Sequence, residues 1–223
     1  MRTRLRVQTS FGERKQRSET VEPKNIYIIS IVGEGKTEED YFDGLKDSGR
    51  TGLVKIERLE KEDETDTKSH PKYVYELLEE RSTYWQEHGV APYELWMVVD
   101  RDKGNVSESQ LKEIIRQCEE RGYGLAISNP TFELWLLLHL TDKDAYDEDD
   151  LYENRKVNKQ KRFLEKALAD LLGGYRKSNF KFDKFQSGIN DAIVRGKAMP
   201  SDNDELVDKL GTSVWILVDK ILQ

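Results

Sequence analysis

The sequence predicts an α/β/α fold in which helices cover both faces of a mostly parallel, four-stranded sheet, followed by a C-terminal helical lobe. Four short apolar segments recur between residues 26 and 127, and a segment with helical spacing follows each of them. Parallel strands require such crossover connections. Beyond residue 142 only helical patterns remain. We therefore expect a flexible basic arm (1–25), an α/β domain (26–141) and a helical lobe (142–223).

The four predicted strands differ in how strongly they are marked. The first is a nearly continuous β-branched run, which is typical of a strand buried on both faces, and the second alternates more weakly. The expected strands are 26–32, 53–59, 95–99 and 125–127.

The predicted helices follow from apolar residues at spacings of three and four. A helix after the fourth strand should open around Asn129 and Pro130, because proline suits a first helical turn and asparagine is a preferred N-cap. The helical patterns cover 37–45, 71–85, 111–122, 129–138, 163–172, 185–194 and 206–221.

Composition limits the possible classes of function. The chain has 36 basic and 43 acidic residues, so its net charge of −7 excludes a globally basic nucleic-acid wrapper but permits local basic patches. No apolar stretch approaches the ~20 residues of a membrane span, and no secretory signal is visible. The single Cys118 cannot form an internal disulfide. Together these features predict a soluble, cytoplasmic protein without membrane contact.

Acidic residues follow the two most strongly predicted strands. Glu34 lies between two glycines after the first strand, and Asp100 and Asp102 follow the third. Ligands of open α/β sheets bind beyond the carboxyl ends of the strands. If these strands are neighbours, three carboxylates converge there.

Converging carboxylates repel one another, and a cation would stabilise them at neutral pH. Mg²⁺, or Mn²⁺ in its place, prefers oxygen ligands and is often shared with substrate phosphates. The pattern therefore predicts a metal site at Glu34, Asp100 and Asp102, with phosphoryl transfer or phosphodiester hydrolysis as the reaction class. The alternative without a function is that these acidic residues simply lie in loops or cap helix N-termini.

The same residues resemble a known family. A buried strand followed by Glu-Gly, with a later strand ending in Asp-x-Asp, is similar to the Toprim domain of topoisomerases, primases and OLD-type nucleases. More narrowly, the segments resemble those of the RloB-like proteins of bacteria. These segments are 34–42, 98–102 and 128–139, with a further echo at 199–201.

The resemblance implies a Toprim-type, Mg²⁺-dependent nuclease linked to restriction or phage-defence (abortive infection) loci, often beside an ATPase gene. It implies that Glu34 is a general base or metal-positioning carboxylate and that Asp100 and Asp102 are metal ligands. The implied partners are nucleic acid and an ATPase subunit. DNA, RNA and tRNA all stay open as substrates, as does the oligomeric state.

Four polar residues near these motifs have competing interpretations. Glu38 could be a further metal-site carboxylate or an acid favoured in a first helical turn. Glu133 lies on an apolar helix, where burial of a carboxylate is costly unless a positive or hydrogen-bonding group meets it, so it is a further catalytic candidate. Asn129 is more simply an N-cap, and His139 a core histidine.

Basic residues concentrate in the C-terminal region. With interleaved aromatic residues they could bind a polyanion, although a solvated helix face is the structural alternative. The candidate substrate-binding residues are Lys36, Arg101, Lys156, Lys159, Lys161 and Arg162, and a second run comprises Arg176, Lys177, Lys181 and Lys184.

Two other classes of function compete with the nuclease. Residues 30–37 nearly match the P-loop pattern, but Ser30 replaces the first glycine, the strand continues where a loop should begin, and Glu34 would face a phosphate. The other alternative is a non-catalytic sensor or partner subunit of an ATPase. The two predict ATP binding lost in Lys36→Ala, and a stable complex without activity, respectively.

Overall fold

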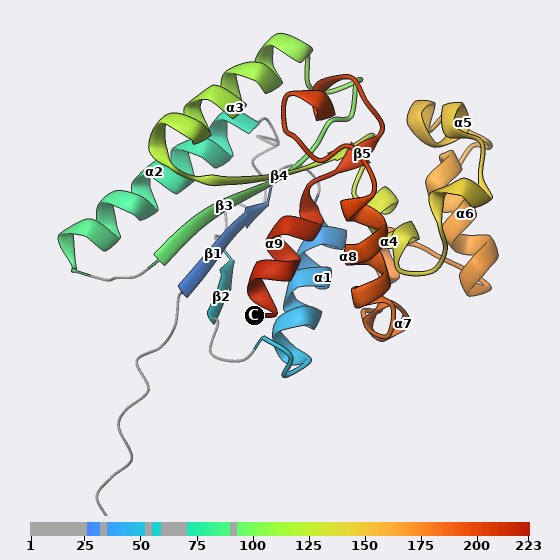
Figure 1. The fold of residues 1–223 in the computed structure, drawn as a ribbon, viewed down its shortest axis with the longest axis horizontal. Helices are drawn as coiled ribbons and strands as arrows, with labels where there is room; N and C mark the ends of the chain where they lie inside the picture. Colours follow the sequence, from blue (N-terminus) through green and yellow to red (C-terminus); the bar gives the residue numbers. More distant parts are fainter. Residues whose placement is uncertain (1–25, 32–34, 52–54, 59–70, 90–92) are drawn as a thin grey trace, which may run out of the picture.

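The fold was analysed in a computed structural model of the chain, which describes residues 26–31, 35–51, 55–58, 71–89 and 93–223. It is an α/β protein built on one mixed sheet (Figure 1). The strands are β1 (Ile26–Ile31), β2 (Lys55–Arg58), β3 (Tyr93–Asp100), β4 (Gly124–Asn129) and β5 (Gly211–Thr212). Their order is β2-β1-β3-β4-β5.

The first four strands run parallel, and β5 is antiparallel to β4. Asp100, the last residue of β3, pairs with Ser128 of β4. The carboxyl ends of β3 and β4 therefore lie side by side, which brings the chain segments that follow them to one edge of the sheet.

Helices pack against both faces of the sheet (Figure 1). On one face α2 (Pro71–Glu87) and α3 (Glu108–Arg121) enclose a core with alternate residues of β3 and β4. The other face carries α1 (Lys36–Asp47), α4 (Glu133–Leu138), α8 (Ile189–Lys197) and α9 (Val214–Ile221). The described residues also form the α-helices α5 (Glu148–Glu153), α6 (Phe163–Leu172) and α7 (Asp183–Gln186).

Local sequence explains both ends of α3. Ser107 caps α3 with its side chain, and Gln110 returns the bond to the Ser107 backbone N–H, which forms a capping box. Gly122 ends the same helix at φ 68°, a left-handed conformation that glycine adopts without strain. The stop expected at Gly122 is thus confirmed.

The expectation of helices alone in the C-terminal region is wrong, because this region also contains a strand. The expected helix over 206–221 is instead a 3₁₀ turn (Glu205–Val207), strand β5 and helix α9. Two side-chain contacts hold this segment against β4. The Ser128 and Thr212 hydroxyls lie 3.0 Å apart, and the Ile127 amide donates to the Ser213 hydroxyl at 2.8 Å. Pairing with β4 outweighs the helical spacing of the segment.

The predicted regions 26–141 and 142–223 share one hydrophobic core. Tyr41 and Phe42 of α1 pack in the same cluster as α4 and the C-terminal helices, including Leu168, Phe185 and Leu217. The predicted arm, 1–25, lies outside the described residues. In the described part of the chain, no helix is both long and apolar enough to cross a membrane.

The helix expected over 185–194 is also divided, into α7 and α8, at Gly188. A Cβ on Gly188 would overlap the backbone carbonyl of His139. We expect Gly188→Ala to destabilise the protein by about 3 kcal/mol, near the upper end for overpacking, because backbone cannot yield as a side chain does. Urea unfolding would measure it, with Gly104→Ala, whose Cβ has ordinary contacts, as control. Equal stability of the two variants would contradict the prediction.

Candidate functional site

Asp100 is a partly buried residue at the end of β3. It lies on the same side of the strand as Val98, which faces α1 and α4. Its Oδ1 atom is buried and has no hydrogen-bond partner. Burial, followed by the negative charges of Glu38 and Glu133, raises the pKa of Asp100 well above its ordinary value. The fold thus holds a carboxylate where its charge is poorly compensated by protein groups.

Glu38 belongs to the first turn of α1 and is only 8% exposed. Burial and the charge of Glu133 raise its pKa to about 7, although a backbone hydrogen bond opposes the shift. The charge of Glu38 in turn raises the affinity of Asp100 for a proton. The competing explanation, an acid placed in a first turn only by the helix dipole, does not account for this burial.

Glu133 is the first residue of α4 and is 2% exposed. It accepts hydrogen bonds from the hydroxyls of Thr131 (2.9 Å) and Tyr175 (3.3 Å), and its Oε1 lies 2.8 Å from Nζ of Lys177. The requirement expected from the sequence, a positive or hydrogen-bonding partner for this carboxylate, is therefore met.

Lys177 connects the cluster to the protein surface. Its side chain is 49% exposed, and Nζ also lies 3.7 Å from Glu165. Partial burial acts to lower the pKa of Lys177, but the charge of Glu133 and the hydrogen bond with it outweigh that effect and raise the pKa. We call Glu38, Asp100, Glu133 and Lys177 the acidic cluster. The cluster contains one ammonium group and three carboxyl groups.

The predicted metal ligands have different outcomes. Glu34 lies outside the described residues. Asp102 is close in sequence to Asp100, but its carboxylate accepts bonds from the Gly104 amide (3.1 Å) and the Asn105 side chain (3.0 Å), within its own loop. Among the described residues no group of three or more His, Cys, Asp or Glu side chains could hold a metal ion. In the described residues the charges of Glu38 and Glu133 act on Asp100, whereas the hydrogen bonds of Asp102 stay within its own loop.

The predicted substrate-binding residues also divide. Arg101 is buried, and its guanidinium donates to the carbonyls of Val106 (2.7 Å) and Val207 (2.8 Å), so it ties the loop after β3 to the segment before β5. Arg162 is half-buried and donates to the Asn154 carbonyl. The remaining candidates lie on the surface: Lys36, Lys156 and Lys159 are exposed, and Lys161 is half-exposed.

Asn129 and His139 both have structural contacts. Asn129 ends β4 and donates to the Leu206 carbonyl at 3.0 Å, so it is not the expected N-cap of α4, which begins four residues later. His139 is a buried core histidine. Its Nδ1 lies 2.9 Å from the Trp135 carbonyl and must carry the proton, which leaves Nε2 to accept from the Tyr41 hydroxyl at 3.1 Å.

Burial lowers the pKa of His139 to about 4, and the charge of nearby Arg195 adds to the effect. The unfolded chain therefore takes up the proton first as the pH falls below about 6.5. We expect His139 to cost the fold about 3 kcal/mol of stability between pH 6.5 and 4.

Glu38 and Asp100 have raised pKa values in the folded protein, so their protonation stabilises the fold as the pH falls, opposite to the effect of His139. The measurement therefore compares the pH dependence of stability in wild type and in a variant without His139. Urea unfolding of His139→Gln across this range should lack the His139 contribution. His88→Gln, which removes an exposed histidine, is the matched control. Parallel profiles for wild type and His139→Gln would contradict a buried neutral imidazole.

The sequence did not identify two members of this site by their roles. Tyr175 and Lys177 belong to a basic, aromatic segment whose composition suggested nucleic-acid binding, yet they contact Glu133. The only available signal was indirect, namely that Glu133 needed a partner. Nothing local to residues 175–177 indicates which carboxylate they meet.

Comparison with known protein families places the chain in one of them. The sequence model of the family described as RloB-like protein matches residues 29–221 of the 223-residue chain. No curated protein and no solved structure matches the chain. The matched region extends from β1 through α9, so it includes both the sheet and the C-terminal helices. The chain belongs to the RloB-like family.

Proposed function

We propose that this protein is a Mg²⁺- or Mn²⁺-dependent nuclease with a Toprim-type α/β core, and that Asp100 binds the metal. The observation that carries the proposal concerns the Oδ1 atom of Asp100, which is buried and has no hydrogen-bond partner. The negative charges of two further carboxylates, Glu38 and Glu133, act on the same group. With all three ionised, Lys177 offsets one charge and leaves two, the charge of one divalent ion. The donors are oxygen atoms, as Mg²⁺ requires.

The residues would have distinct roles. Asp100 and Glu38 would hold the ion, with Glu34 and Asp102 as further candidates from the family resemblance. A bound Mg²⁺ would supply charge stabilisation at the scissile phosphate and a more acidic water. Burial and the charge of Glu133 raise the pKa of Glu38 to about 7, and a cation beside it would stabilise its ionised form. Lys177 orients Glu133.

The proposal extends to the biological setting only through the family. A role in a bacterial restriction-linked or phage-defence system, together with an ATPase subunit and in the cytoplasm, is part of it. Nucleic acid is the proposed substrate.

The test is a cleavage assay with purified protein. Wild type should cleave single- or double-stranded DNA or RNA with Mg²⁺ or Mn²⁺ and lose that activity in EDTA. Asp100→Asn should be inactive with either metal. Cleavage that persists in Asp100→Asn would refute the assignment.

A non-catalytic subunit of an ATPase is the second candidate. Two observations favour it: Lys177 already neutralises part of the acidic cluster, and the described residues contain no group of three that could hold a metal. If this candidate is right, Mg²⁺ and Mn²⁺ should leave the melting temperature of purified protein unchanged. If the protein is a metal-dependent nuclease, either metal should raise the melting temperature of wild type but not that of Asp100→Asn.

A further inference from the structure

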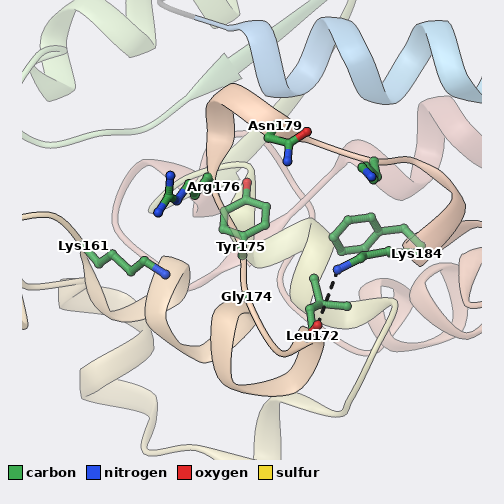
Figure 2. Close-up of a pocket in the computed structure, with 9 residues that line it drawn as sticks. Lys161, Leu172, Gly174, Tyr175, Arg176, Asn179 and Lys184 are labelled. Carbon is green, nitrogen blue, oxygen red and sulfur yellow. Dashed lines mark hydrogen bonds between the residues drawn. The ribbon is translucent and has the colours of Figure 1, made fainter.

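A basic pocket lies beside the acidic cluster. It has a volume of about 400 Å³ and is lined by Lys161, Leu172, Gly174, Tyr175, Arg176, Asn179, Lys181, Lys184 and Phe185 (Figure 2). Four lining residues are cationic and none is acidic. Lys161 and Arg176 lie on one side of Tyr175, and Lys184 lies on the other (Figure 2).

The cations of this pocket are available to a ligand. Arg176, Lys181 and Lys184 are exposed, and no ion pair joins any of the four to an acid within the described residues. The Lys184 ammonium makes only a long contact, 3.4 Å, with the Leu172 carbonyl. Like charges gathered without counter-charges favour an anion.

Tyr175 connects the pocket to the acidic cluster. It lines the pocket, and its hydroxyl donates to Oε1 of Glu133. Lys177, two residues further along, contacts the same oxygen at 2.8 Å. A phosphate that enters the pocket is therefore separated from the Glu133 carboxylate by one side chain, that of Tyr175.

The size and lining of the pocket restrict the ligand. A volume of about 400 Å³ suits a small ligand or one unit of a polymer rather than a duplex. Leu172 and the aromatic residues Tyr175 and Phe185 supply apolar wall, and Asn179 supplies an amide. Cations beside apolar surface are typical of sites that bind a phosphate together with its nucleoside.

We propose that this pocket binds one nucleotide unit of a single-stranded nucleic acid, next to the phosphate that the acidic cluster cleaves. The inference rests on the proposed nuclease function for the identity of the substrate. It assigns backbone binding to Arg176, Lys181 and Lys184 with Lys161, rather than to Lys156 and Lys159.

The test is fluorescence anisotropy of a labelled 12-mer, as RNA and as DNA, titrated with intact protein in EDTA so that no cleavage occurs. Wild type should bind the single strand more tightly than the blunt duplex of the same sequence. Arg176→Ala/Lys181→Ala/Lys184→Ala should weaken single-strand binding at least 10-fold at 0.1 M salt and reduce the salt slope by about 0.7, the contribution of the one phosphate that a nucleotide unit places in the pocket. The matched control is the exposed set Lys112→Ala/Arg116→Ala/Lys209→Ala, which should bind as wild type does.

Each outcome has one interpretation. Equal affinity of the pocket triple variant and wild type, no binding by wild type, or a preference for duplex would overturn the inference, whether or not the protein cleaves. Pocket-dependent binding without cleavage under any metal condition would support the inference and refute the nuclease.

Discussion

Asp100→Asn should abolish metal-dependent cleavage and, in the absence of metal, raise the melting temperature. Loss of a metal ligand removes several kcal/mol of transition-state stabilisation, so a decrease of at least about 10³-fold is expected. The opposite effect on stability follows from the raised pKa of Asp100: burial and the charges of Glu38 and Glu133 make the ionised form unfavourable in the folded state. Asparagine keeps the shape and removes the charge.

The measurement combines a cleavage assay with thermal unfolding in EDTA at pH 8. In a chain of this size each kcal/mol shifts the melting temperature by about 2–4 °C. Asp191→Asn, at an exposed aspartate of α8, is the matched control and should change neither quantity appreciably. A lower melting temperature for Asp100→Asn would mean that the carboxylate stabilises the fold, contrary to the proposal of a site that awaits a cation.

Lys177→Met should destabilise the protein by about 2–3 kcal/mol. The substitution leaves Glu133, 2% exposed, without its cation, while the Thr131 and Tyr175 hydroxyls still donate to it. Removal of one partner from a fully buried pair costs more, about 3–5 kcal/mol, but half of the Lys177 side chain is exposed and water can partly replace it.

Three variants separate this charge effect from loss of packing. Lys177→Met/Glu133→Gln should recover most of the stability, because the uncompensated carboxylate is gone. Lys166→Met, which breaks the exposed pair with Asp170, should cost less than about 1 kcal/mol. Urea unfolding at pH 7.5 measures all of them. A double variant no more stable than Lys177→Met would show that the lysine acts through its methylene chain instead.

The sequence predicted best where a property is local. The run 95–99 ends at Asp100 in β3, and the alternation of apolar runs with helical patterns placed β1 to β4 in order. Glu133 stood out because its neighbours are apolar, so a buried carboxylate with a partner could be expected. These inferences depend on a few adjacent residues and on the regular side-chain directions along a strand or a helix.

Prediction failed where a contact joins distant segments. Residues 206–221 have helical spacing, yet Gly211 and Thr212 pair with β4, some 84 residues away. Arg101 is basic and follows the metal-site motif, yet its guanidinium is buried against the carbonyls of Val106 and Val207. The spacing of apolar residues does not show that residues 211–212 pair with β4 or that Arg101 meets the two valine carbonyls.

Patterns in the sequence were enough to predict the α/β class, the acidic end of β3 and the basic residues between 155 and 184. The folded chain was needed to find that the charges of Glu38 and Glu133 act on Asp100 and that Lys177 pairs with Glu133. The reason is that a buried charge depends on groups brought to it by folding. Their distances arise from packing of α1, α4 and the segment 175–177 around one strand end, which no local pattern specifies.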